Sequence, residues 1–207
     1  MPGTYCYVLA THNQTKVDEY RFITQLLLPG WTPVIYDGPE PVEDGLTFQD
    51  NALIKARAAA AHTGMPAAAD DSGLCVDVLG GSPGIFSAYW AGHRKDLAAN
   101  RDLLLDQICD IPDPHRTARF TSALALVAPD GREHVALAHW HGRIAHTPAG
   151  DDGFPFDSVF VPEDDQPAPG QPIALWDAAL RYRRSHRAQA LRALLPAFHA
   201  LTRGAGT

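Results

Sequence analysis

Two adjacent carboxylates, Asp70 and Asp71, stand in the run Ala-Ala-Ala-Asp-Asp-Ser-Gly-Leu at residues 67–74. Two acids so close repel each other, and a bound cation would relieve that repulsion. A carboxylate beside a cation can also hold and activate a water molecule. An alternative interpretation of the same residues is a strand that ends in an Asx turn over residues 70–73. If the strand continues instead, the two carboxylates point to opposite sides of it.

A second polar group lies at residues 10–16, Ala-Thr-His-Asn-Gln-Thr-Lys, where a short β-type run passes into a helical pattern. A helix N-terminus presents unpaired N–H groups and the positive end of the helix dipole. Thr11 and Asn13 add hydrogen-bond donors, and Lys16 adds a full positive charge one turn into the helix. The pattern favours phosphate binding, although it lacks the glycines of a Walker loop. Ordinary helix capping is the alternative explanation.

A third group combines a helix with the acidic loop before it. Asn51 and Lys55 are one turn apart on a helix predicted over residues 47–62, so they share a face. The loop over residues 37–45 carries several acids, Glu43 among them, and some of these could join the paired aspartates in an oxygen cage around Mg²⁺. Solvated surface charge is the alternative for both features.

Two later segments suggest a ligand with a ring. Residues 153–157, Gly-Phe-Pro-Phe-Asp, place two aromatics beside a carboxylate, which suits a nucleobase. The alternative is a loop whose aromatics fold back on the core. Residues 181–187, Arg-Tyr-Arg-Arg-Ser-His-Arg, are strongly basic and are predicted at the start of the last helix, where the dipole does not favour cations. That placement indicates an anionic or carbonyl-bearing ligand.

The elements that must position these residues are strands, in which side chains alternate with a period of two residues, and helices, with a period of about 3.6 residues. The pattern predicts strands at residues 5–10, 32–36, 73–78 and 159–161, helices at 16–28, 47–62, 95–108 and 185–201, and a hairpin of strands 117–128 and 133–145 around a turn at 129–131. Such an arrangement is an α/β fold with a mixed sheet.

Composition limits the classes of function. The 207 residues are 45% hydrophobic and 20% charged, which suits one globular domain. The net charge of −7 argues against a nucleic-acid partner, because backbone binding needs a basic face. Three widely spaced cysteines are expected to be reduced in a cytoplasmic protein. The sequence shows neither a signal peptide nor a membrane span, so we expect no membrane partner.

Taken in order, these motifs resemble the inosine triphosphate pyrophosphatase (Ham1-like) family, whose members hydrolyse noncanonical purine nucleoside triphosphates. The resemblance spans nearly the whole chain. The matching segments are Leu9-Ala10-Thr11-His12-Asn13 with Lys16 and Glu19, residues 45–48 with 51–52 and 55–56, residues 69–74, 76–77, 80–84, 87–88 and 91–92, residues 148–150, and Ser185-His186-Arg187 with residues 190–191.

The resemblance implies a fold and a reaction. The expected fold is an elongated mixed β-sheet with flanking helices, whose two lobes surround a central cleft within a single domain over residues 1–207. The expected reaction is Mg²⁺-dependent hydrolysis of ITP, dITP or XTP to the monophosphate and pyrophosphate, which removes these nucleotides from the pool. A cytoplasmic homodimer is expected.

The resemblance also implies roles for single residues. Asp71 would be the general base or would orient the water, and the metal would lie on Asp70, Asp71 and Glu43. The remaining substrate-binding residues fall into two sets. The triphosphate would be bound by Thr11, His12, Asn13, Lys16, Lys55 and Ser72, and the base by Phe154, Pro155, Phe156, Asp157, Arg181, His186 and Arg187. Within the second set, His186 and Arg187 would donate to a 6-oxo group and reject the amino group of adenine.

The predicted base site departs from the family pattern. The family has Phe-Gly-Tyr/Trp-Asp-Pro where this chain has Phe-Pro-Phe-Asp-Ser at residues 154–158, and Arg181 is the nearest match to a usual lysine. Proline in place of glycine fixes φ and removes an N–H. One alternative function is therefore hydrolysis of a modified nucleotide in a specialised biosynthetic pathway. Another is a nucleotide sensor without catalysis, which the intact aspartate pair and the two lysines argue against.

Overall fold

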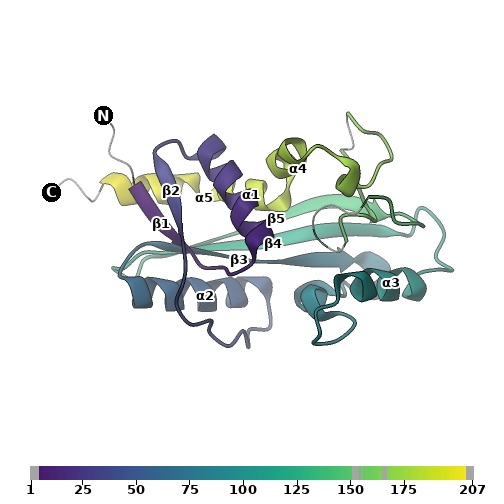
Figure 1. The fold of residues 1–207 in the computed structure, drawn as a ribbon, viewed down its shortest axis with the longest axis horizontal. Helices are drawn as coiled ribbons and strands as arrows, with labels where there is room; N and C mark the ends of the chain where they lie inside the picture. Colours follow the sequence, from purple (N-terminus) through teal and green to yellow (C-terminus); the bar gives the residue numbers. More distant parts are fainter. Residues whose placement is uncertain (1–4, 151–153, 155, 165–166, 204–207) are drawn as a thin grey trace. The chain divides into compact units, whose positions relative to one another are not determined.

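The computed structural model describes residues 5–150, 154, 156–164 and 167–203. Its strands form one sheet in the order β2-β1-β3-β4-β5-β6, and β1 runs parallel to β2 and β3 whereas β6 is antiparallel to β5 (Figure 1). The strands are β1 (Tyr5–Leu9), β2 (Trp31–Ile35), β3 (Ala67–Val76), β4 (Thr117–Val127), β5 (Glu133–Ile144) and β6 (Phe160–Pro162). The helices are α1 (Gln14–Leu27), α2 (Phe48–Thr63), α3 (Leu97–Gln107), α4 (Ala178–Arg184) and α5 (His186–Arg203). The predicted mixed sheet with flanking helices is confirmed.

The chain divides into two compact units. Unit 1 comprises residues 1–71, 122–138 and 182–207, and unit 2 comprises residues 72–121 and 139–181. Strands β3, β4 and β5 each begin in one unit and end in the other. The prediction that residues 1–207 act as one functional domain stays a prediction.

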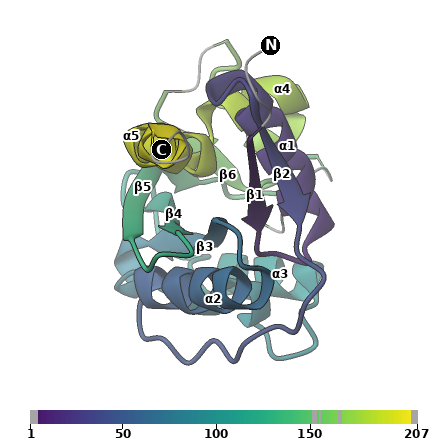
Figure 2. The ribbon, with the colours of Figure 1, turned by 90° about the vertical axis from the view of Figure 1, so that its left-hand side faces the viewer.

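Unit 1 has helices on both faces of its strands (Figure 2). On one face, an alanine-rich surface of α2 that includes Ala56 packs on small residues of the strands, among them Ala67 and Ala69 of β3. On the other face, α1 and α5 cover larger side chains in a cluster that includes Tyr7, Ile23, Leu124 and Phe198. Small side chains on the α2 face let that helix approach the sheet closely, so its polar residues Asn51 and Lys55 reach Asp71 of β3.

Unit 2 has its own apolar core. Large side chains from several elements meet there, among them Leu104, Phe120, Trp140, Phe160 and Trp176. Among the residues that the structure describes, no helix combines the length and the apolarity that crossing a bilayer requires.

The structure corrects the predicted elements in two places. β3 runs without interruption from Ala67 to Val76, so the Asx turn proposed over residues 70–73 is wrong. The last helix, predicted over residues 185–201, is confirmed as α5, but a helix that was not predicted, α4, precedes it, and three of the four arginines of the basic segment lie in α4 rather than at the start of the last helix. The side-chain contacts of the two aspartates explain the first correction, because they stabilise an extended backbone that Asp and Gly disfavour on their own.

Candidate active site

Strand β3 sends its two aspartates to opposite faces of the sheet. Asp70 lies on the same side as Ala68, which packs in the cluster covered by α1 and α5. Asp71 lies on the side of Ala67 and Ala69, which pack in the cluster covered by α2. The alternation of a strand therefore separates the two carboxylates and gives each of them its own helix partners.

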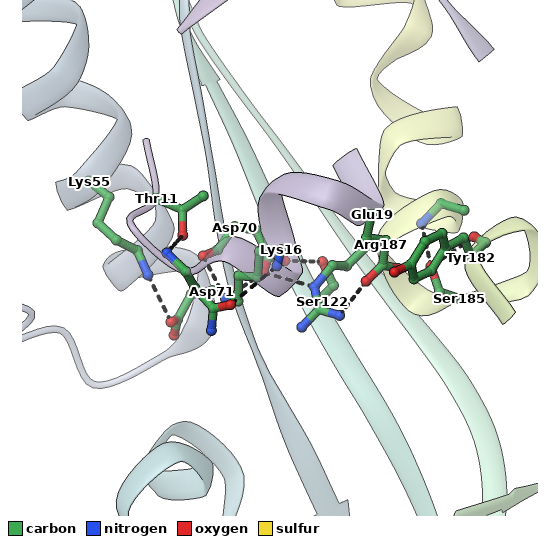
Figure 3. A network of polar contacts seen from close by, with 12 residues as sticks. Thr11, Lys16, Glu19, Lys55, Asp70, Asp71, Ser122, Tyr182, Ser185 and Arg187 are labelled. Carbon is green, nitrogen blue, oxygen red and sulfur yellow. Dashed lines mark hydrogen bonds and ion pairs between the residues drawn. The ribbon is translucent and has the colours of Figure 1, made fainter. Parts of the chain in front are cut away.

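Asp70 is the centre of a buried ion-pair network in unit 1 (Figure 3). Its side chain is 1% exposed, and its Oδ2 lies 2.7 Å from Lys16 Nζ and 3.2 Å from Arg187 Nε. Ser122 Oγ donates to Oδ1 at 2.6 Å. Arg187 Nη1 donates to Glu19 Oε2 at 2.8 Å, so two buried carboxylates face two cations.

Asp71 belongs to a second, less buried network on the α2 side. Lys55 Nζ lies 3.0 Å from Asp71 Oδ1 and 3.0 Å from Glu43 Oε2. Asn51 Nδ2 donates to Asp71 Oδ2 at 3.4 Å, and Asn51 Oδ1 accepts from the N–H of Gly45 at 2.9 Å. The structure thus brings together residues that were predicted to act together: Glu43 of the loop, Asn51 and Lys55 of α2, and Asp71 of β3.

The two aspartates differ in proton affinity. Burial raises the pKa of Asp71, and the positive charges of Lys55 and Lys16 offset only part of that rise. Burial also acts to raise the pKa of Asp70, but Lys16, Arg187 and the hydroxyl of Ser122 outweigh it and hold that pKa well below its ordinary value. Asp70 is therefore ionised near neutral pH, and Asp71 is the more basic carboxylate of the two.

The two lysines also differ. Burial lowers the pKa of Lys16, and the charge of Asp70 opposes that fall only in part. Burial acts in the same direction on Lys55, but Asp71 and Glu43 outweigh it, so the pKa of Lys55 lies above its ordinary value. Each lysine thus lies beside a carboxylate of β3: Lys16 beside Asp70 and Lys55 beside Asp71.

The segment before α1 acts partly as a cap. Asn13 is the N-cap residue, and its Oδ1 accepts from the N–H of Lys16 at 3.2 Å. Thr11 Oγ1 accepts from the N–H of Asn13 at 3.1 Å. His12 stacks on Tyr36 and lies 2.8 Å from Glu40 Oε1. Helix capping, the alternative explanation of this segment, is therefore present. The cap also determines where α1 begins and places Lys16 in its first turn.

The predicted base-binding loop lies in unit 2, except for Pro155, which is outside the described residues. Phe156 is 2% exposed and packs in the core cluster of that unit, whereas Phe154 is partly exposed. Asp157 is buried, accepts from the N–H of Phe154 at 3.0 Å, and has Arg181 Nε 3.9 Å from its Oδ2. The ring of Phe156 thus takes the core position that the sequence left open as an alternative.

The other predicted residues lie in both units. Ser72 is partly exposed and belongs to unit 2, and His186 is buried at the start of α5 in unit 1. Arg187, predicted to read the base, directs its guanidinium to Asp70 and Glu19. Among the described residues, no group of three or more histidine, cysteine, aspartate or glutamate side chains is placed to hold a metal ion. The set of three metal-binding acids stays a prediction.

The sequence analysis missed Ser122. It lies in the apolar strand β4, and a hydroxyl among alanines and leucines was the only available signal. Glu19 entered only as part of a motif, although it is 2% exposed and pairs with Arg187. A charged residue on the apolar face of a helix, beside Tyr20 and Ile23, is a usable sign of a buried partner.

The chain is similar to known proteins over almost its full length. Residues 7–197 match the model of the Ham1 family. It is 52% identical to a protein of Leifsonia xyli subsp. xyli named dITP/XTP pyrophosphatase, over 95% of this chain and 96% of that one. It is 47% identical to a protein of the same name from Streptomyces avermitilis, over 91% and 94%.

Solved structures have the same fold. A crystal structure described as nucleoside-triphosphatase / dITP/XTP pyrophosphatase from Mycobacterium abscessus is 43% identical, with a TM-score of 0.72 over 92% of this chain and 99% of that one. A HAM1 protein from Coxiella burnetii is 32% identical, with a TM-score of 0.80 over 95% and 99%. With this match in sequence, in fold and in the order of its motifs, the chain belongs to the Ham1 family.

Proposed function

We propose that the protein hydrolyses dITP, ITP and XTP to the monophosphate and pyrophosphate. One observation carries the proposal: adjacent aspartates of β3 each hold a lysine from a different helix, Lys16 on α1 and Lys55 on α2. Two ammonium groups beside two carboxylates of unequal basicity suit a reaction that binds a triphosphate and activates a water. The names of the relatives from Leifsonia xyli and Streptomyces avermitilis support the same reaction.

In this proposal, Asp71 removes a proton from the water that attacks the α-phosphorus. Its raised pKa supports that role, because a more basic carboxylate accepts a proton more readily near neutral pH. Lys16 and Lys55 neutralise the negative charge of the phosphate oxygens, in the bound triphosphate as in the transition state. The N–H groups of the first turn of α1, with Thr11, His12, Asn13 and Ser72, complete phosphate binding.

The residues present fit a divalent cation at Asp71 and Glu43. An oxygen of each lies 3.0 Å from Lys55 Nζ, so the two carboxylates are near neighbours, and one or two carboxylates together with substrate phosphates are the ligands by which proteins usually bind Mg²⁺. A bound Mg²⁺ would supply charge neutralisation at the phosphates and would lower the pKa of a bound water. Asp70 fits this role less well, since Ser122, Lys16 and Arg187 already contact both of its oxygens.

Base recognition is assigned to Phe154, Asp157, Arg181 and His186, since the guanidinium of Arg187 contacts Asp70 and Glu19 instead. A modified purine is the second candidate substrate, and the position of Phe156 favours it. Phe156 stands at the position where the family has a Tyr or Trp. Its ring is 2% exposed and packs in the core of unit 2. A base site with one fewer stacking ring and hydroxyl or indole donor would tolerate substituents that the family pattern excludes.

The test is pyrophosphate release with Mg²⁺ from ITP, dITP, XTP, GTP, ATP and CTP. We expect ITP, dITP and XTP to react fastest and Asp71→Asn to lower kcat by at least about 10²-fold, as loss of a general base does. Asp77→Asn is the matched control, because Asp77 pairs with Arg119 on the surface of unit 2. Release that Asp71→Asn leaves intact would refute the role of Asp71.

Release confined to other bases would move the substrate to a modified nucleotide, and release from none would favour the sensor alternative. Omission of Mg²⁺ with a chelator should abolish the reaction. The homodimer, the cytoplasmic location, and the expectation of neither nucleic-acid nor membrane partners stay predictions.

A further inference from the structure

Ser122 is a polar residue in an otherwise apolar part of β4. It is 0% exposed, and the residues that follow it, Ala123 and Leu124, pack in the clusters on the two faces of the sheet. A buried hydroxyl is unfavourable unless it is hydrogen-bonded. Ser122 Oγ meets that need by donating to Asp70 Oδ1 at 2.6 Å.

That hydrogen bond determines how the carboxylate of Asp70 is oriented. With Oδ1 held by Ser122, Oδ2 faces Lys16 Nζ at 2.7 Å and Arg187 Nε at 3.2 Å. Rotation of the carboxylate would break all three contacts together. Arg187 is held in turn by Glu19, so the opposite side of the network is fixed as well (Figure 3).

Lys16 has a flexible four-carbon side chain, and its ammonium also donates to the backbone carbonyl of Asp70 at 3.3 Å. Among the described residues, both oxygens that the ammonium contacts thus belong to one residue, Asp70. The position of the ammonium therefore depends on the position of Asp70, and the position of the Asp70 carboxylate depends on Ser122.

We infer that Ser122 is a positioning residue for nucleotide binding: by fixing the carboxylate of Asp70, it holds the Lys16 ammonium at the first turn of α1. The inference rests on the proposed function, in which Lys16 binds the triphosphate. Ser122 itself contacts neither substrate nor water in this role.

Ser122→Ala should raise KM for dITP about tenfold, because it removes the hydroxyl that fixes the Asp70 carboxylate and, through it, the Lys16 ammonium. Lys16 binds phosphate in the ground state and in the transition state alike, so kcat should change by less than about twofold. In a Lys16→Ala background the same serine substitution should cause no further rise in KM, because neighbours that act through one another are not additive.

Thr24→Val is the matched control. Thr24 is also a fully buried hydroxyl of unit 1, and it is hydrogen-bonded at 2.7 Å to Tyr7, outside the Asp70 network. It should lower stability without changing KM. If Ser122→Ala leaves KM at the control value, or raises it equally in the Lys16→Ala background, the inference is overturned.

Direct binding of inorganic pyrophosphate by calorimetry separates this inference from the proposed function. We expect Kd to be about tenfold higher for Ser122→Ala than for wild type and Thr24→Val, whichever nucleotide is hydrolysed. If wild type hydrolyses no nucleotide, the proposed function fails, and the Kd values alone decide the role of Ser122. Equal Kd values, or no binding of pyrophosphate by wild type, overturn it.

Discussion

Asp70 joins two buried cations, so its charge should contribute strongly to stability. Replacing it by the isosteric asparagine leaves Lys16 and Arg187 with half of their counter-charge, and breaking a buried pair in this way destabilises a protein by about 3–5 kcal/mol. We expect Asp70→Asn to lower the free energy of unfolding by about that amount at pH 7, measured by urea denaturation. Asp77→Asn, at a half-exposed ion pair, should cost less than about 1 kcal/mol.

The same substitution should change how stability depends on pH. The pKa of Asp70 is lower in the folded protein than in the unfolded chain, so its contribution is complete above the unfolded value of about 3.9. The contribution is lost as the pH falls from there through the folded-state pKa. The stability difference between wild type and Asp70→Asn should therefore narrow in acid. A difference that stays constant down to about pH 3 would show that the effect is one of packing rather than charge.

Helix α2 positions Asn51 and Lys55, and its start depends on one cap. Thr47 Oγ1 accepts from the N–H of Asp50 at 3.1 Å and donates to Asp50 Oδ2 at 2.7 Å. Thr47→Ala should destabilise the protein by about 1 kcal/mol, which lowers Tm by about 2–4 °C for a chain of this length. Calorimetry of Thr47→Ala beside Thr47→Ser tests this, because serine retains the capping oxygen. If both variants melt alike, the hydroxyl is not what stabilises the helix start.

The sequence predicted elements well where periodicity is strong, as in α1, α2 and the β4–β5 hairpin. It failed at β3, where Asp-Asp-Ser-Gly is typical of a turn but tertiary ion pairs hold the strand extended. It also failed at α4, whose seven residues are too short a run to show a helical period. Local propensity decides such segments only when no distant partner competes with it.

The candidate site was predictable where polar residues share a helix face, as Asn51 and Lys55 do. The sequence did not predict which aspartate each lysine contacts, because the choice between Asp70 and Asp71 depends on which face of β3 each helix covers. The same limit applies to Arg187, which the sequence placed at the base and the structure places at two buried carboxylates. Contacts between residues more than a hundred positions apart follow from the topology of unit 1, which the sequence shows only through motifs.

The charge of the entire protein should influence nucleotide binding differently from the two lysines. A net charge of −7 repels a triphosphate at long range, and salt screens that repulsion. Lys16 and Lys55 are each 14% exposed, so salt weakens their short-range attraction much less. We therefore expect kcat/KM for dITP to stay level or to rise by up to about threefold between about 0.02 and 0.2 M salt.

A double variant tests that explanation. Asp110→Asn with Glu163→Gln removes two negative charges from exposed positions of unit 2. If long-range repulsion limits association, this variant should be faster than wild type at low salt and equal to it at high salt. A steep fall of kcat/KM with salt in wild type would instead point to attraction by exposed basic residues. It would contradict the view that the main attraction for the phosphates comes from two mostly buried lysines, each beside an aspartate of β3.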